Sequence, residues 1–274
     1  MDNGSSDDSL SGLGEMALPL CIHKNPANRG FAAGCNQGAQ DSNAEYLLFL
    51  NPDTRLTDQA LQDPIHLMKQ LQNSNLGICG IRLRDDRGSP TTCSARFPTL
   101  ISMWLEGTGL HRRAPKHFVA HRQSELRSEV VKVDQVIGAY FLVRRHVFDL
   151  LSGFDERFFV YFEEVDLSLR ARNAGYWSCV VGNVTAYHTG CLSSDQVKDR
   201  RLFYYWRSRL IYARKHFTWP KRCGVLILTF VVEPSVRLLQ AALFASIDGV
   251  LVTARAYVYL IQHFLLGKRG DHAR

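Results

Sequence analysis

The sequence predicts an α/β fold, with a parallel or mixed sheet covered by helices. Tyr46–Leu50 is a short, continuous apolar run, which is typical of a strand buried on both faces. Strand-like and helix-like segments alternate over the first two-thirds of the chain. The 274 residues are 46% hydrophobic and 22% charged, which is enough for a substantial core. This composition excludes a disordered or collagen-like chain.

After the first strand, Thr57 and Asp58 predict the start of a helix that runs to about Leu71. Pro64 lies inside this pattern, so we expect a kink or a later start. A second strand is expected over Leu76–Leu83, and residues 84–132 are expected to form long loops and short elements. The predicted buried face of the helix holds Leu61, Ile65, Met68 and Leu71.

Regular patterning returns after residue 132. Val136–Arg144 is an apolar, strand-like segment, and His146–Leu151 predicts a short helix that ends before Gly153. Glu163–Ala174 predicts a longer helix with Gly175 at its C-terminal boundary. Tyr176–Val181 then predicts another strand. We assign residues 1–195 to one catalytic domain.

The cysteines and the first residues indicate a reducing compartment. The seven cysteines are widely scattered and form no C-x-x-C pair, so we expect neither a disulfide framework nor a zinc ribbon. Met1–Gly14 has no apolar core, so we expect no signal peptide. Both features predict a cytoplasmic protein.

Residues 196–274 form a basic and apolar region, with 14 Lys and Arg against 4 Asp and Glu. Leu202–Phe217 predicts an aromatic helix rich in arginine, and Gly224–Val232 carries no charge. Glu233-Pro234 divides the apolar sequence from Gly224 to Leu266, and neither half reaches the length of a spanning helix. We therefore expect amphipathic helices on a membrane surface, with Trp, Tyr and Arg at headgroup level. The alternative is a helical subdomain packed on the catalytic core. The apolar content argues against a nucleic-acid partner.

Asp53 is a candidate metal ligand because it directly follows a buried strand. Ligands of α/β sheets collect beyond the carboxyl ends of strands, and a carboxylate there can hold a divalent ion that bridges phosphates. The alternative is a simple turn, since Asn51-Pro52-Asp53-Thr54 is also good turn chemistry. His188 follows a strand-like segment and has a role only if it lies near Asp53.

Three carboxylates lie within four residues at the start of a helix: Glu163, Glu164 and Asp166. Acidic residues favour helix N-termini for structural reasons alone. However, the aromatic segment before them would place these acids in a partly dry site, where a general base can be tuned.

The stretch from Asn28 to Gly38 is punctuated by glycines and enters a helix, so it could cradle a phosphate. Its spacing matches neither the Walker A loop nor the dinucleotide fingerprint. Taken alone it is therefore weak evidence.

The order of the motifs is more specific than any one of them. The series comprises Asp2-Asn-Gly-Ser-Ser-Asp7, Asn28-x-Gly-Phe-x-x-x-x-Asn36-x-Gly38, Leu48-Phe-Leu-Asn-Pro-Asp-Thr54, Gly138-Ala-x-Phe-Leu-Val-Arg-Arg145, Gly153-Phe-Asp-Glu-x-Phe-Phe159, Glu163-Glu-Val-Asp-Leu-x-x-Arg170 and His188. Over residues 2 to about 217 it resembles the family-2 glycosyltransferases, above all the rhamnosyltransferase-type branch. The resemblance implies a GT-A fold, with a mixed, mostly parallel sheet.

The resemblance also implies a role for each matching residue. Asp2 would contact the nucleotide base, and Asp53 would bind Mn²⁺ or Mg²⁺ on the diphosphate with His188 nearby. Glu164 matches the second acid of the family's Glu-Asp pair, the general base, although this chain has Glu163-Glu164 there. The other residues implied at the nucleotide-sugar site are Asn3, Asn28, Gly30, Asn36, Asn51 and Gly138.

The resemblance implies an inverting transfer of a sugar in cell-surface polysaccharide synthesis. The expected donor is dTDP-rhamnose or a UDP-hexose, and the expected acceptor is a saccharide or a lipid-linked saccharide. Such an acceptor would explain a basic, apolar C-terminal region at the inner face of the cytoplasmic membrane.

Family members begin further upstream, with a first strand that this chain lacks, so we expect a truncated gene model. One alternative is therefore a catalytically impaired paralogue that binds a membrane or a partner. A nucleotidyltransferase is the other, but the chain has no glycine-rich, lysine-containing triphosphate loop.

Overall fold

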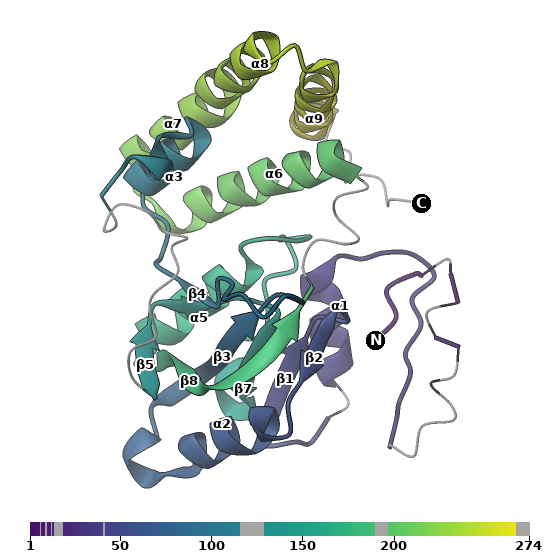
Figure 1. Cartoon of the computed structure of the whole chain (residues 1–274), viewed down its shortest axis with the longest axis vertical. Helices are drawn as coiled ribbons and strands as arrows, with labels where there is room; N and C mark the ends of the chain where they lie inside the picture. The colour runs from purple at the N-terminus through teal and green to yellow at the C-terminus, as the bar shows by residue number, and fades with distance from the viewer. Residues whose placement is uncertain are drawn as a thin grey trace.

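The computed structural model describes residues 1–5, 7–8, 10–11, 13, 19–40, 42–115, 129–189 and 197–266. A sheet with its flanking helices forms one layer, and a second layer of helices lies across it (Figure 1). The helices and strands, in chain order, are α1 (Phe31–Gln40), β1 (Tyr46–Leu50), β2 (Thr54–Leu56), α2 (Gln59–Lys69), β3 (Leu76–Arg84), β4 (Ser94–Ala95), α3 (Leu100–Gly107), β5 (Val130–Val133), β6 (Gln135–Val136), β7 (Tyr140–Arg144), α4 (Arg145–Leu150), α5 (Glu163–Asn173), β8 (Trp177–His188), α6 (Lys198–His216), α7 (Trp219–Ile227), α8 (Glu233–Leu243) and α9 (Ile247–Leu266).

The central sheet is mixed and flanked by helices, as predicted. Its strand order is β1-β7-β3-β8-β2, with β5 also paired to β8. Within the described residues, β3 and β8 pair in parallel, and the other ladders of this sheet are antiparallel. The expectation of a mostly parallel sheet was therefore wrong for this part of the chain, because β7 inserts between β1 and β3 and runs opposite to both.

The strand directions place several chain segments at one edge of the sheet. Since β7 is antiparallel to both β1 and β3, and β3 is parallel to β8, the strands β1, β3 and β8 all run the same way. The carboxyl ends of β1 and β8 therefore lie at the same edge. There Leu50 pairs with Tyr140, and Thr54 pairs with His188.

Two predicted elements differ in their details. In α2 the buried residues are Ala60, Pro64 and Met68, whereas Leu61 is 43% exposed and Leu71, beyond the end of the helix, is 93% exposed. The predicted strand Val136–Arg144 is divided, because β6 pairs with β4 in a separate small sheet before the chain turns into β7.

Other differences concern the length of elements. β8 continues past Val181 to His188, since its second half pairs with both β2 and β3. The region 84–132 contains β4, β5 and α3, and Thr99 and Ser102 form a capping box at the start of α3. Residues 116–128 and the expected domain boundary at 195/196 lie outside the described residues.

The second layer has its own hydrophobic core, formed mainly by α6, α7, α9, α3 and the start of α5. Trp206 and Tyr212 of α6 are buried in it. Arg209 is also fully buried and forms a 2.7 Å ion pair with Glu233 of α8. The aromatic face of α6 thus packs inside the protein, so the expectation that its Trp, Tyr and Arg side chains sit at headgroup level was wrong for these residues.

The segment from Trp219 to Leu243 forms one continuous 25-residue helix, in which a π-helical turn over Leu228–Val232 joins α7 to α8. By length and composition alone this helix could cross a membrane. An 18-residue stretch of it has a mean hydropathy of 1.6, and 33% of that stretch is buried. The sequence analysis did not expect such a length, because it divided the segment at Glu233-Pro234. In the structure the helix continues through this dipeptide, and Arg209 pairs with the Glu233 carboxylate.

Candidate active site

Asp53 and His188 meet at the edge of the sheet where β1 and β8 end. Oδ1 of Asp53 lies 3.3 Å from Nε2 of His188, and both side chains are largely buried. Nδ2 of Asn51 lies 3.4 Å from the same ring nitrogen. The structure therefore brings together the carboxylate, the imidazole and the amide that the sequence analysis singled out separately.

The backbone around these side chains is tied to β7. Asn51 N–H and the Thr54 hydroxyl both donate to the carbonyl of Ala139, at 3.2 and 3.3 Å. The neighbouring Gly138 faces open space, since an added Cβ would meet no atom within 4 Å. The edge thus combines a fixed turn with room beside it for a ligand.

The residues present fit a divalent cation. Asp53 Oδ1 is buried and accepts no hydrogen bond from the described residues, so it is available to a cation. Carboxylate oxygen and imidazole nitrogen are both common ligands of Mn²⁺. The described residues hold no cluster of three or more His, Cys, Asp or Glu that would enclose a metal. Two protein ligands leave coordination positions for phosphate oxygens and water, as at many phosphate-binding metal sites.

The predicted nucleotide-pocket residues near the start of the chain form one hydrogen-bonded cluster. Asn3 Nδ2 donates to the side chain of Asn28 at 3.1 Å and to the carbonyl of Gly30 at 2.9 Å. Asn25, which the sequence analysis missed, donates to Asn3 Oδ1 at 3.0 Å. The carboxylate of Asp2 accepts the Ser5 amide at 3.0 Å. Hydrogen bonds from Ser5 lower the pKa of Asp2.

Gly30 joins this cluster to the loop before α5. Its φ of +90° favours glycine, and an added Cβ would lie 2.4 Å from the carbonyl oxygen of Phe159. Phe31 N–H donates to that same oxygen at 2.7 Å. The start of α1 is thus fixed against the segment that leads to the acidic helix.

The acidic helix begins after a strained turn. Tyr161 and Phe162 have φ values of 68° and 70°, which bulky residues rarely adopt. Helix α6 supports this turn, because the Ser208 hydroxyl donates to the Val160 carbonyl at 2.8 Å and the ring of Tyr205 contacts both aromatic rings. Packing against α6 therefore fixes the start of α5.

The three acids at this helix start differ in their surroundings. Glu163 is 5% exposed. Burial, followed by the nearby charge of Glu164, raises the pKa of Glu163 well above its ordinary value. Glu164 is half-buried and therefore more accessible to a substrate.

Asp166 is fully buried and surrounded by basic side chains. Its carboxylate lies 2.7 Å from Arg170 Nε, 2.8 Å from Lys215 Nζ and 2.7 Å from His216 Nε2. Burial alone would raise the pKa of Asp166, but the hydrogen bonds from His216 and Lys215 and the charge of Arg170 lower it. An acid held in this way is a poor general base. Of these partners, Lys215 and His216 lie in the basic last turn of α6.

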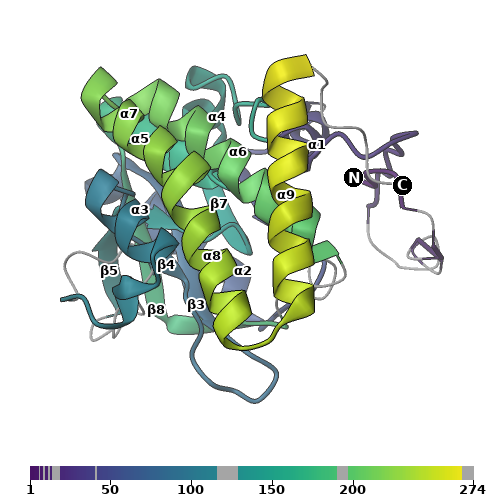
Figure 2. The ribbon, with the colours of Figure 1, turned by 90° about the horizontal axis from the view of Figure 1, so that it is seen from above.

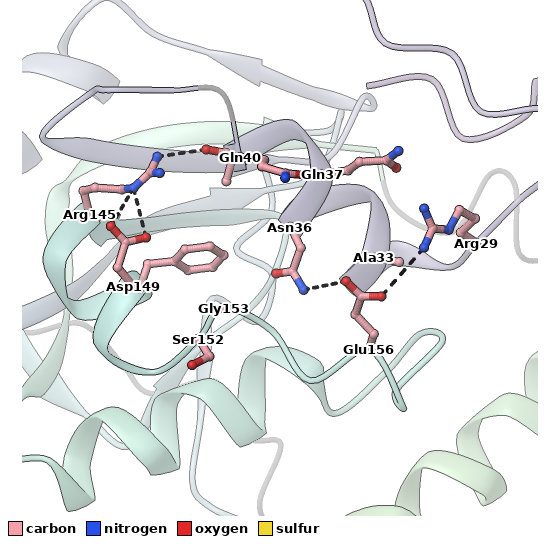
Figure 3. Close-up of a pocket in the computed structure, with 12 residues that line it drawn as sticks. Arg29, Ala33, Asn36, Gln37, Gln40, Arg145, Asp149, Ser152, Gly153 and Glu156 are labelled. Atoms are coloured by element: carbon pink, nitrogen blue, oxygen red, sulfur yellow. Dashed lines mark hydrogen bonds and ion pairs between the residues drawn. The ribbon is translucent and has the colours of Figure 1, made fainter.

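Asn36 lies apart from the other predicted site residues. It accepts the Phe154 amide and donates to the Phe154 carbonyl, both at 2.9 Å, so it holds the loop after α4. A cavity of about 420 Å³ beside it is lined by residues of α1, of α4 and of the segments next to these helices, among them Arg29, Arg145 and Glu156 (Figure 3). Neither Asp53 nor Glu164 lines this cavity, and the role of Asn36 at the donor site stays a prediction.

Comparison with known proteins identifies the family. Residues 1–149 match the glycosyl transferase family 2 sequence family. The chain belongs to glycosyl transferase family 2. It is 26% identical over 232 residues to the N-acetylglucosaminyl-diphospho-decaprenol L-rhamnosyltransferase of Mycobacterium tuberculosis, covering 80% of this chain and 75% of the relative. It is 24% identical over 243 residues to the low-salt glycan biosynthesis hexosyltransferase Agl10 of Haloferax volcanii, with 81% and 73% coverage.

A solved mannosyltransferase structure has the same fold. The mannosyltransferase PcManGT from Pyrobaculum calidifontis, in complex with GDP-Man and Mn²⁺, superposes with a TM-score of 0.53 at 12% identity. The match covers 97% of this chain and 77% of that protein. It confirms the GT-A fold, and together with the family match it makes this chain a glycosyltransferase.

Proposed function

We propose that this glycosyltransferase moves a sugar, with inversion, from a nucleoside-diphosphate donor to a lipid-linked saccharide used in cell-surface glycans. The observation that carries the proposal is the Asp53–His188 pair at the carboxyl edge of the sheet, in a chain that also fixes an accessible acid at the start of α5. The rhamnosyltransferase and hexosyltransferase relatives support rhamnose or another hexose as the transferred sugar.

Asp53 and His188 would hold the divalent ion, Mn²⁺ or Mg²⁺. When bound, the ion would neutralise charge that develops on the diphosphate leaving group. Asn3, Asn28 and Gly30 would shape the nucleotide pocket through the cluster described above. The expected nucleotides are dTDP and UDP.

Glu164 is the proposed general base. It accepts the proton of an acceptor hydroxyl while that oxygen attacks the anomeric carbon, and the bond from this carbon to the diphosphate breaks on the opposite face. Glu163 is 5% exposed, and burial and the nearby charge of Glu164 raise its pKa well above the ordinary value, so the more accessible Glu164 is the preferred base. Asp166 holds α5 in place through its cations.

Helices α7, α8 and α9 form the proposed contact with the cytoplasmic face of the membrane. They lie on the far side of α6 from the sheet in Figure 1, and Figure 2 shows that α8 meets α9 at the turn that joins them. Large apolar side chains on them are exposed, among them Ile227, Val231, Leu239, Leu243, Leu251 and Leu265. The number of large exposed apolar side chains on these helices supports an interaction surface, and a lipid-linked acceptor would place it at the bilayer.

The test is transfer of labelled rhamnose from dTDP-rhamnose, or of a hexose from its UDP form, to a prenyl-diphosphate-linked N-acetylglucosamine acceptor. We expect Glu164→Gln to lower kcat by about 10²–10⁴-fold, the range for loss of a general base. Glu163→Gln is the matched control and is expected to retain most of the activity. Near-normal turnover by Glu164→Gln would contradict its assignment as the base.

A further inference from the structure

Helix α6 carries several cations, and three of them have an acidic partner among the described residues. Lys198 pairs with Asp248 at 3.2 Å, Arg209 with Glu233 at 2.7 Å, and Lys215 with Asp166 at 2.8 Å. Arg207 differs from these residues. Its Nε donates to Nε2 of His263 on α9 at 3.2 Å, and no described carboxylate lies within ion-pair distance of it.

Arg207 is also half-buried, which makes the missing counter-charge costly. Burial lowers the pKa of Arg207, so its surroundings disfavour the charged form that an arginine nevertheless keeps. Breaking or omitting the partner of a buried charge destabilises a protein. A guanidinium held in this way points to an anion that joins it in the working complex.

Other groups on the same helix face would serve such an anion. Arg200 and Arg207 lie four residues before and three residues after Tyr204, so all three share one face of α6. Burial raises the pKa of Tyr204, and the charges of both arginines act in the opposite direction. The Arg200 guanidinium also lies 5.6 Å from the centre of the Tyr259 ring on α9. The α6–α9 junction is therefore a cationic and aromatic surface.

This junction lies between the acidic helix and the apolar layer. The ring of Tyr204 stacks on Phe159, with centroids 4.5 Å apart and an interplanar angle of 14°. Phe159 belongs to the loop that contacts Gly30 and leads to Glu163. On the other side, α9 exposes apolar side chains such as Val258 and Leu265.

We propose that Arg207, with His263 and Arg200, binds the phosphate or diphosphate group of a lipid, foremost that of the lipid-linked acceptor. The proposal rests on the proposed function and adds a subsite to it. A guanidinium can make two parallel hydrogen bonds to phosphate oxygens, and the neighbouring imidazole and second guanidinium can bind the remaining oxygens. The lipid chain would then lie against the apolar face of α9, with the sugar directed toward the start of α5.

Calorimetric titration of the full chain with geranyl diphosphate tests this subsite. EDTA is added so that a metal-dependent donor site cannot bind the probe. We expect Arg207→Gln to weaken binding by about tenfold or more, as for loss of a charged hydrogen bond. Arg207→Lys, which keeps the charge but loses the planar fork, should bind about threefold more weakly. Arg214→Gln, on an exposed position of the same helix, should bind like the wild type.

Two outcomes would overturn the proposal: wild-type affinity in Arg207→Gln, or an equal loss in Arg207→Gln and Arg214→Gln. If the glutamine variant does not fold, as judged by its melting temperature, the lysine variant decides, and unchanged affinity in it would contradict the planar contact.

Co-sedimentation with phosphatidylglycerol–phosphatidylcholine vesicles separates the two sources of phosphate. If Arg207→Gln loses vesicle binding in proportion to geranyl diphosphate binding, the bound phosphate belongs to a phospholipid headgroup. If it loses geranyl diphosphate binding alone, the bound phosphate belongs to the lipid-linked acceptor. Binding of dTDP or UDP with Mn²⁺ is measured in parallel. Its failure would contradict the proposed function but not this subsite.

Discussion

Replacing Asp166 by asparagine separates a structural role of this acid from a catalytic one. The substitution keeps the shape of the side chain but removes the charge that Arg170, Lys215 and His216 share. Removing one partner from a buried ion pair costs about 3–5 kcal/mol. These basic side chains keep 18%, 23% and 12% exposure and can turn partly toward water. We therefore expect a loss of about 2–3 kcal/mol in the free energy of unfolding.

The assay is urea unfolding of the wild type and Asp166→Asn, with kcat measured at a temperature where both are folded. We expect kcat to stay within about tenfold of the wild type, because loss of a general base costs about 10²–10⁴-fold. A stability loss below about 0.5 kcal/mol, the level of an ordinary surface substitution, would refute the structural role. A large fall in kcat with unchanged stability would make Asp166 the base.

The difference in stability between the wild type and Asp166→Asn should also depend on pH, in a direction that the pKa of Asp166 determines. The pKa of Asp166 is lowered in the folded state, so its contribution to stability is present above the unfolded pKa of about 3.9. That contribution is lost as the pH falls through the folded value. The stability difference between wild type and Asp166→Asn should therefore persist at pH 5 and 7 and shrink below about pH 4.

Two further substitutions test how the layers are held. Gly30→Ala should destabilise the protein more than Gly88→Ala in urea unfolding, because both positions have positive φ but only at Gly30 would the new Cβ meet a carbonyl oxygen at 2.4 Å. The Gly88 variant should lose about 1–2 kcal/mol, the cost of the left-handed conformation alone, and equal losses would contradict the close approach. Arg209→Met should cost about 3–5 kcal/mol, whereas Arg209→Met combined with Glu233→Met should cost much less, because the double variant leaves no buried charge unpaired. Additive losses would show that the pair itself stabilises the fold.

The sequence predicted those elements whose local pattern agrees with their packing. Tyr46–Leu50 is a strand as expected, and Gly175 marks the C-terminal boundary of α5 with a φ of +91°. The expectation that this strand is buried on both faces was wrong, because β1 is the last strand in the order of the described sheet and buries only Leu47 and Phe49. Elements that depend on distant partners were predicted less well. The break between β6 and β7 arises because β6 pairs with β4, which lies in the polar region that showed no periodicity.

The site residues show the same contrast between local sequence patterns and contacts with distant partners. Asp53 and His188 are far apart in sequence, and only the antiparallel pairing of β2 with β8 shows that they meet. Asn36 falls in a glycine-punctuated motif but bonds to the backbone of Phe154, which no sequence pattern distinguishes from a donor contact. The role of α6 in supporting α5 was hidden because its aromatic and basic residues equally fit a membrane surface.

Calorimetric titration of the chain with dTDP and UDP, with and without Mn²⁺, tests the central claim most directly. We predict binding of at least one nucleotide that requires Mn²⁺ and is lost in Asp53→Asn. Asp86→Asn, which removes an exposed carboxylate paired only with Arg55 among the described residues, should bind like the wild type. Nucleotide binding that is independent of Mn²⁺, or equal in Asp53→Asn and the wild type, would contradict the assignment of this sheet edge as the metal and donor site.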